Sequence, residues 1–509
     1  MRRHVVWLCV LAVLGGLALV VIYRPIAHLA RTAHDDRDER EPIEYGHVDD
    51  ASRLNSTPVH RIERIMSDSE NQEAVLVDLL AEARSSGRRV AIAGSRHSMG
   101  GHTIYPDGII LDMSGWNEMS LDLEDSVLNV QAGATWDEVI DLLDAHGLSV
   151  SIMQSNDSFT VGGSISVNCH GWQFGRPPIA SSVRSFRIML ADGDVVRCSR
   201  EENAELFSLA LGGYGLFGII LDVALDVVPN ELYEIDQRVL STDEALRFFD
   251  DDLAGREGLS MLYARMDVTP DSLLDELILN AFFVSSGVPK TKAGSLEDGE
   301  PSNQALSELK RIIFRGSSGS DFGKSLRWDA ESRLAPMVLG RTYTRNALLD
   351  EGVEILENRS AGTTDILHEY FVPREGAEAF VDRVRQIVTG HESDLLNVTV
   401  RQVETDEDTF LRYADGPMIS FVMLFVQDRN ESGEEDMVEM TRELIDASLD
   451  LGGRYYLPYR LHATREQFRR AYPRSDRFFE LKALYDPGEL FQNQFYRRYG
   501  PVADPKPAG

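Results

Sequence analysis

Cysteine and basic residues are scarce in this 509-residue sequence. One of its three cysteines lies in an apolar amino-terminal run, and none belongs to a Cys-x-x-Cys pair. This argues against a disulfide framework and against a zinc or iron–sulfur centre, so we expect no metal site. The 51 lysines and arginines stand against 83 aspartates and glutamates, giving a net charge of -32. Since a nucleic-acid partner requires a basic face, we expect none.

A long apolar run occupies the amino terminus. Val5–Tyr23 is uncharged, follows two arginines and precedes the acidic stretch Asp35–Glu41. About 20 apolar residues cross a bilayer core, and this charge asymmetry favours an amino terminus inside the cell. We therefore expect a cytoplasmic tip (1–4), a single transmembrane anchor (5–23), an acidic linker (24–58) and a body on the extracytoplasmic side. A cleaved signal peptide is the alternative.

Residues 89–114 combine two apolar runs with a glycine turn that contains a histidine. Val90–Ala93 and Ile109–Leu111 are expected strands, and the turn 94–101 lies between them. Glycine lets backbone N–H groups approach an anion because no Cβ blocks them. No helix pattern follows directly, so this is neither a Walker loop nor a dinucleotide-binding turn. Taken alone, the turn is equally compatible with a solvent-facing His97.

Further glycine-bearing segments follow in the same chain. Residues 155–171 are dense in glycine and hydroxyl groups and include Thr160–Gly163 and His170–Gly171. By itself this segment is compatible with simple close packing. A long apolar strand begins at Gly218–Ile219, and Asn493 ends an Asp-Pro-Gly-Glu-Leu-Phe-Gln-Asn stretch near the carboxy terminus.

In this order, the motifs resemble those of the vanillyl-alcohol-oxidase-type (PCMH-type) FAD enzymes, most closely the sugar, D-arabinono-1,4-lactone and alditol oxidases. The resemblance implies an α+β fold with a two-subdomain FAD-binding domain (59–235). It also implies a substrate or cap domain (236–470) whose antiparallel sheet covers the flavin, a segment returning to the FAD domain (471–499) and a tail (500–509). The implied cofactor is FAD, bound covalently through His97.

The resemblance also implies which residues contact the cofactor. They are Gly94, Ser95, Arg96, His97, Ser98, Gly101, His102, Ser155, Thr160, Gly162, Gly163, Ser166, His170, Gly171, Gly218, Ile219 and Asn493.

Two expected strands carry candidate catalytic groups. Alternation along residues 365–373 places Glu369 and Phe371 on one face, with His368 and Tyr370 on the other. Residues 397–404 carry Arg401. In the resembling oxidases a glutamate on such a strand lies near the substrate hydroxyl. Without the resemblance, a salt bridge at the sheet surface would be the preferred explanation of Glu369 and Arg401.

The stretch 452–462 departs from the family pattern. Where the family has roughly Arg-Pro-His-Trp-x-Lys, this sequence keeps Arg454 but has tyrosines, of which Tyr456 and Tyr459 are catalytic candidates. Tyrosine is a neutral donor and stabilises negative charge on a reduced flavin less than lysine or histidine. This difference leaves the substrate and the oxidant open. Residues 303–350 are expected to be mostly helical and carry no recognised motif.

The resemblance implies oxidation of a CH–OH group of a sugar, polyol or aldonolactone by hydride transfer to flavin N5. Oxygen, a quinone or a cytochrome would be the acceptor. Glu369 or a tyrosine would orient or deprotonate the hydroxyl, and Arg401 would bind the substrate or the reduced flavin. One alternative is a reductase or epimerase of the same fold acting on a lipid-linked substrate. The other is a membrane-tethered binding protein without flavin.

Overall fold

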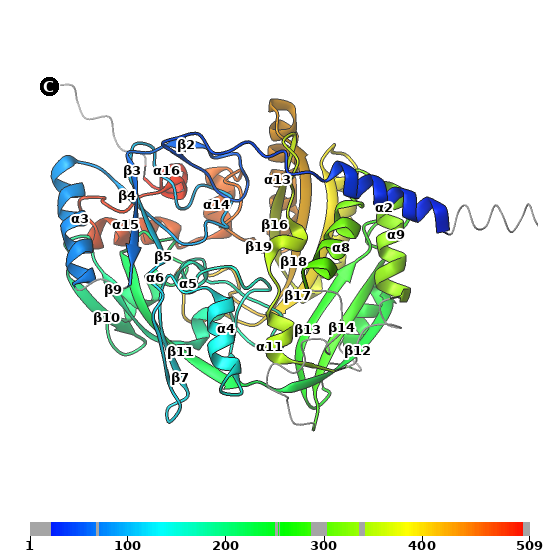
Figure 1. The fold of residues 1–509 in the computed structure, drawn as a ribbon, viewed down its shortest axis with the longest axis horizontal. Helices are drawn as coiled ribbons and strands as arrows, with labels where there is room; N and C mark the ends of the chain where they lie inside the picture. Colours follow the sequence, from blue (N-terminus) through cyan, green and yellow to red (C-terminus); the bar gives the residue numbers. More distant parts are fainter. Residues whose placement is uncertain are drawn as a thin grey trace, which may run out of the picture.

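The computed structural model describes residues 22–67, 71–249, 253, 255–286, 303–334 and 342–501. Two assemblies of sheet and helix lie side by side, with the strands of residues 61–229 on the left of Figure 1 and most strands of residues 232–428 on the right. The predicted anchor, residues 5–23, falls almost entirely outside these ranges and stays a prediction. Within the described ranges, no helix is both long enough and apolar enough to cross a bilayer.

The first assembly contains a small parallel sheet that carries the glycine turn. Its strand order is β3 (Arg61–Met66), β5 (Ile109–Gly115) and β4 (Val90–Ala93), and both pairings are parallel. Parallel strands need a crossover, which α3 (Gln72–Ser86) supplies between β3 and β4. The buried leucines of α3 pack against β4 and β5. The expected strands on either side of the glycine turn are thereby confirmed.

A second, antiparallel sheet completes this assembly. Its order is β10-β9-β11-β7-β6, and β8 also pairs with β11. Its strands β9 and β10 form a hairpin, with Val195 opposite Met189. The elements are β6 (Met119–Asp122), β7 (Val127–Gln131), α4 (Trp136–Asp144), β8 (Leu148–Val150), α5 (Val161–Ser166), β9 (Val183–Met189), β10 (Val195–Ser199), α6 (Ala204–Ala210) and β11 (Ile219–Pro229).

The second assembly is built on an antiparallel sheet in the order β15-β12-β14-β13-β17-β18-β16-β19. Its strands are β12 (Leu232–Ser241), β13 (Leu259–Met266), β14 (Glu276–Val284), β15 (Thr342–Thr344), β16 (Thr363–Pro373), β17 (Asp394–Val403), β18 (Met418–Asp428) and β19 (Arg454–Tyr455). The strands expected from alternation in this part of the chain are confirmed.

Helices cover both faces of this sheet. On one face, α12 (Ala377–Val388) and α13 (Glu431–Asp450) pack against β16 and β18. On the other face, Phe314 of α8 (Asn303–Arg315) packs against Leu424 and Leu396. The helix α9 (Asp321–Asp329) follows α8, as the expected helical character of this segment predicts.

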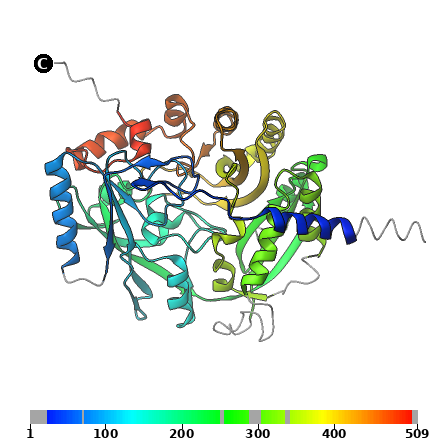
Figure 2. The same cartoon turned by 45° about the horizontal axis from the view of Figure 1, so that its top comes forward.

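The carboxy-terminal segment returns to the first assembly, as Figure 2 also shows. After α14 (Arg465–Ala471) and α15 (Ser475–Tyr485), Phe491 forms a parallel bridge with Val90. Lys482 and Asp486 form an ion pair with both side chains 0% exposed. Asp486 also accepts hydrogen bonds from the backbone N–H groups of Leu490 and Phe491. The last helix is α16 (Gln494–Tyr499).

The structure corrects the predicted acidic linker over residues 24–58, because most of this segment belongs to the folded body. It begins with α2 (Arg24–Asp35), which lies beside α8 and α9 (Figures 1 and 2). Nε2 of His28 lies 2.7 Å from the carbonyl oxygen of Gly316, and the Arg24 guanidinium lies 4.0 Å from the ring centroid of Phe322. These contacts are polar, so a search for apolar periodicity could not reveal them.

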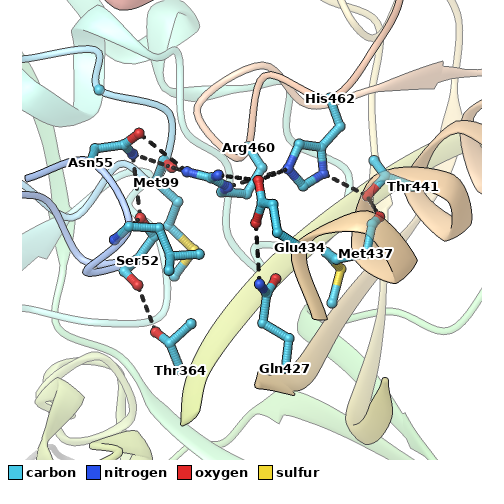
Figure 3. Close-up of polar contacts among 12 residues, drawn as sticks. Ser52, Asn55, Met99, Thr364, Gln427, Glu434, Met437, Thr441, Arg460 and His462 are labelled. Carbon is cyan, nitrogen blue, oxygen red and sulfur yellow. Dashed lines mark hydrogen bonds and ion pairs between the residues drawn. The ribbon is translucent and has the colours of Figure 1, made fainter. Parts of the chain in front are cut away.

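The later part of the same segment is held by a buried polar network. It contains β1 (His47–Val48) and β2 (Thr57–Pro58), and the buried carboxylate of Asp50 accepts the N–H of Gly101 at 2.7 Å. Figure 3 shows Asn55 and Met99 beside Arg460. The amide of Asn55 donates to the carbonyl of Met99 at 3.0 Å and accepts from Arg460 at 3.2 Å.

The same network continues into α13. Arg460 pairs with Glu434, whose Oε1 also lies 3.1 Å from Nε2 of His462. Nδ1 of His462 in turn lies 2.9 Å from the hydroxyl of Thr441, as Figure 3 shows. Burial would raise the pKa of Glu434, but these basic partners lower it to about 2. The network ties the glycine turn and the tyrosine-bearing stretch to the second assembly.

Candidate active site

A cavity of about 800 Å³ lies between the two assemblies. One wall is formed by the glycine-bearing loops of the first assembly, and the other by the sheet face and by α8. Most of the residues predicted from the sequence line it. They are Gly94, Ser95, Arg96, His97, Ser98, His102, Ser155, Thr160, Gly162, Gly163, Ser166, His170, Gly218, Glu369, Arg401, Tyr456 and Tyr459.

Four predicted cofactor residues lie behind this lining. Gly101 adopts a φ of +67°, which favours glycine, and Ile219 is fully buried in the core. A Cβ at Gly171 would lie 2.1 Å from a backbone oxygen of Met153, so this glycine permits close packing of the backbone. Asn493 donates to the carbonyl of Tyr214 at 2.8 Å. These residues position the cavity wall without forming part of it.

The structure places Arg454 away from the chemistry, which corrects its prediction as a catalytic residue. Its Nη2 pairs with Asp415 at 2.7 Å and its Nη1 donates to the carbonyl of Gly453. Strand β19 pairs with the end of β16, where Arg454 lies opposite Phe371. The neighbouring Tyr455 is buried, whereas the Arg454 side chain is 15% exposed and paired with a surface carboxylate.

The glycine turn (94–101) meets the loop that carries Phe159, and this contact places His97 in the cavity wall. The ring of His97 stacks on Phe159, with centroids 4.1 Å apart and planes inclined by 20°. The turn is held by Arg96, whose φ of 57° is left-handed and whose guanidinium pairs with Asp112 at 3.1 Å. Burial lowers the pKa of His97, so its imidazole is neutral at neutral pH.

Unsatisfied buried groups mark this wall as a binding surface. Ser98, Thr103 and Arg401 line the cavity. Their buried atoms Ser98 Oγ, Thr103 Oγ1 and Arg401 Nε have no hydrogen-bond partner among the described residues. Buried polar groups are normally paired, because leaving one unpaired costs about 1–3 kcal/mol. Together with the backbone exposed at the glycines, they fit a large polar cofactor such as FAD.

Gly94 is the tightest point between the two loops. A Cβ there would lie 2.0 Å from Oγ1 of Thr160. We expect Gly94→Ala to separate the loops, to weaken flavin binding about tenfold and thereby to lower flavin occupancy, since such overpacking costs about 1–3 kcal/mol. The ratio of flavin absorbance to protein absorbance in the purified protein measures this effect.

Gly416→Ala is the matched control, because a Cβ there meets no atom within 4 Å. It should retain wild-type flavin content. Full occupancy in Gly94→Ala would show that the contact with Thr160 does not shape the site.

The polar centre of the cavity is the carboxylate of Glu369. Its Oε1 lies 2.5 Å from Nε2 of His170 and accepts the hydroxyl of Ser420 at 2.5 Å. Its Oε2 has one hydrogen-bond partner within the described part of the chain, the more distant hydroxyl of Tyr459 at 3.4 Å. Arg401 donates to the hydroxyl of Ser155 at 2.6 Å on the same wall. Oε2 is therefore the oxygen available to a bound substrate.

Electrostatics keep this carboxylate charged and the nearby phenol neutral. Burial would raise the pKa of Glu369, but His170, Arg401 and Ser420 hold it below its ordinary value. Burial, reinforced by the Glu369 charge, raises the pKa of Tyr459 well above its ordinary value. At neutral pH the cavity thus presents a carboxylate acceptor beside a phenol donor.

Sequence reasoning missed residues on the sheet side of the cavity. Tyr263 and Arg265 alternate along β13, with Asn280 on β14 and Gln237 on β12 beside them. A strand pattern alone cannot say which face of a strand meets a cavity formed with another domain. The residues of α8 that line the cavity were not predicted, because residues 303–350 carry no recognised motif.

Comparison with known proteins adds independent findings. Residues 70–199 match the family model described as an FAD binding domain. The chain is 24% identical over 453 residues to decaprenylphosphoryl-β-D-ribose oxidase of Mycolicibacterium smegmatis, covering 84% of this chain and 92% of that protein. It is 26% identical to cytokinin dehydrogenase 10 of Oryza sativa subsp. japonica, over 78% and 77% of the two chains. Over a shorter alignment, which covers 30% of this chain and 35% of the relative, the chain is 32% identical to L-gulonolactone oxidase of Mus musculus.

Proposed function

Because this chain belongs to the PCMH-type FAD-dependent oxidoreductases, we propose that it oxidises a CH–OH group of a sugar, polyol or aldonolactone to a carbonyl. The observation that carries this proposal is the buried Glu369 carboxylate, ionised and open at Oε2, within the cavity that the FAD-binding loops enclose. The similarity to an L-gulonolactone oxidase supports this substrate class.

The residues present have defined tasks in this reaction. FAD, when bound, supplies the acceptor for the hydride from the substrate carbon. Oε2 of Glu369 takes the hydroxyl proton, while His170 and Ser420 hold Oε1 and fix the carboxylate plane. Tyr459 donates to the substrate oxygen or to the carboxylate.

Arg401 lines the cavity and contributes positive charge beside the reacting groups. Ser98, Thr103 and the loop bearing His97 would hold the cofactor, with His97 as its covalent attachment point. The acceptor that reoxidises the flavin is oxygen, a quinone or a cytochrome. We also propose that an amino-terminal anchor holds the body at the extracytoplasmic face of the membrane.

Anaerobic reduction tests the function directly. The purified holoenzyme is mixed with sugars, alditols and aldonolactones in turn, and flavin absorbance is followed without oxygen. A true substrate should bleach the flavin, and readmission of oxygen or of a quinone should restore the colour. Failure of every CH–OH donor in the panel would contradict the proposal.

The reductase or epimerase alternative is separated by oxygen uptake. An oxidase consumes oxygen in proportion to the carbonyl formed, whereas an epimerase changes the substrate without net consumption of an acceptor. A protein without flavin would show no flavin absorbance at any stage.

A further inference from the structure

One row of side chains crosses the sheet side of the cavity from Glu369 to Arg265. Strand register places Glu369 opposite Val422 and Val422 opposite Thr399. Thr399 in turn lies opposite Arg265. Residues directly opposite each other in an antiparallel sheet point to the same face, and all of these residues line the cavity. Neighbouring strands lie about 4.8 Å apart, so about 14 Å separates the backbones at the two ends of this row.

The guanidinium of Arg265 is accessible from the cavity. Tyr263 and Arg265 line the cavity, whereas Ala264 and Met266 are buried in the core, as strand alternation requires. The Arg265 side chain is 33% exposed. Within the described part of the chain its guanidinium has one hydrogen-bond partner, Glu331, whose Oε1 lies 2.9 Å from Nη1. A guanidinium has several N–H donors, so Arg265 keeps donors for a ligand.

Glu331 does not neutralise this end of the row, because it is shared with a second arginine. Nε of Arg327 lies 2.8 Å from the same Oε1. Arg327 is buried, and it also donates to the carbonyl of Leu396 at 2.8 Å and to Oδ1 of Asn397 at 2.7 Å. Burial would raise the pKa of Glu331, but the two arginines hold it below its ordinary value. Two guanidinium groups against one carboxylate leave a net positive charge.

The second assembly as a whole makes its side of the cavity positive. Its cationic lining residues are Arg265, Lys310, Arg327 and Arg401. The carboxylates that line the same side are fewer, namely Glu331, Glu351 and Glu369. This excess of positive charge is the opposite of the chain's net charge of -32. The loops predicted to contact the cofactor form the other wall, so these charges face the space left for a substrate and favour an anionic one.

Neutral hydrogen-bonding groups lie beside Arg265 on the same sheet face. Tyr263 lies opposite Asn280, and Asn280 lies opposite Gln237. Nε2 of Gln237 donates to Oδ1 of Asn280 at 2.7 Å, and the amide of Asn397 donates to the hydroxyl of Thr399 at 3.1 Å. All of these residues line the cavity. Phenol, amide and hydroxyl groups in this arrangement suit the hydroxyl groups of a sugar.

We propose that Arg265 binds the carboxylate of an acidic sugar, at the end of the substrate remote from the hydroxyl that reaches Oε2 of Glu369. This inference rests on the proposed oxidation and specifies its substrate class. The substrate is longer than a single sugar ring, because the row spans about 14 Å. A carboxylate matches the planar guanidinium. A phosphate monoester carries more negative charge and would be repelled more strongly by Glu331.

A matched pair of disaccharide derivatives tests the proposal. Lactobionate and lactitol both carry a galactose ring on an open sugar chain, and they differ in whether that chain ends in a carboxylate or in a CH₂OH group. Each is titrated anaerobically into the full-length holoenzyme by calorimetry. We expect lactobionate to bind about 10- to 100-fold more tightly, the usual effect of a charge-assisted hydrogen bond. Arg265→Met should abolish this difference, while flavin content stays unchanged.

Arg256→Met is the matched control. Arg256 also pairs with a carboxylate at 2.9 Å, that of Asp236, but it is not among the described residues that line the cavity. It should keep the preference for lactobionate. Equal Kd values for lactobionate and lactitol in the wild-type protein would overturn the proposal, as would a preference that survives in Arg265→Met.

Glu331→Gln gives a second measurement with the opposite sign. It removes the carboxylate that competes for Arg265, so lactobionate should bind more tightly than in the wild-type protein, with lactitol unchanged. This variant decides the proposal should Arg265→Met fail to fold, as judged by flavin absorbance. An Arg265-dependent gain for trehalose 6-phosphate over trehalose, without a gain for lactobionate over lactitol, would overturn the assignment to a carboxylate.

Binding and turnover separate this inference from the proposed function. A preference for lactobionate that depends on Arg265, without bleaching by any CH–OH donor, would support the carboxylate site and contradict the oxidation. Bleaching by neutral polyols together with equal Kd values for the matched pair would support the oxidation and contradict the carboxylate site.

Discussion

Glu369→Gln should reduce the rate of anaerobic flavin reduction by a factor on the order of 10² to 10⁴, the usual contribution of a positioned general base. Glutamine preserves the size of the side chain but cannot take a proton at the position of Oε2. The cofactor loops are untouched, so flavin content should remain at the wild-type level. Stopped-flow absorbance with a saturating substrate measures the rate, and the substrate concentration dependence separates binding from proton transfer.

Glu375→Gln is the matched control, since this glutamate follows β16 and is exposed. It should reduce flavin at the wild-type rate. A normal rate in Glu369→Gln would remove the carboxylate from the chemistry. Its buried contact with His170 at 2.5 Å would then have only a structural meaning.

His97→Ala should abolish covalent retention of the flavin. Trichloroacetic acid releases a noncovalent cofactor, so the wild-type pellet should stay yellow and fluorescent and the variant pellet should be colourless. The lowered pKa of His97, caused by burial, keeps a ring nitrogen unprotonated and able to form such a bond. Its stacking on Phe159 fixes the ring in the cavity wall.

The second histidine of the same loop provides the control. His102 is 5% exposed, lines the cavity and has its pKa lowered to about 3 by burial. His102→Ala should keep a yellow pellet. Loss of colour in His102→Ala alone would move the attachment to that residue, and a colourless wild-type pellet would refute a covalent link.

Much of the cofactor wall was predictable because its signals are local. The glycine turn around His97 and the segment 160–163 take their shape from glycines, which have no Cβ. Glycine positions can be read directly from the sequence. Alternation along residues 365–373 correctly assigned Glu369 and His368 to opposite faces, since strand geometry fixes that period. Glu369 indeed contacts His170, whereas His368 lies 3.3 Å from Thr441 on the face that α13 covers.

The errors arose where a residue's role depends on a distant partner. Arg454 matched a motif, yet it pairs with the exposed Asp415, 39 positions earlier in the chain. The acidic segment 24–58 looked like a linker, yet its polar groups pair with residues hundreds of positions away, such as Arg460 with Asn55.

The sequence by itself determined the glycine turns and the strands beside them, because these signals act within a few residues. The FAD cofactor was implied by the resemblance to the PCMH-type enzymes. Tertiary structure alone decided that Glu369 meets His170 across 199 positions and that Arg265 lies in the same row of the sheet. Those features depend on the register between strands and on which helix covers which face. Both follow from the packing of the whole chain, which no local pattern records.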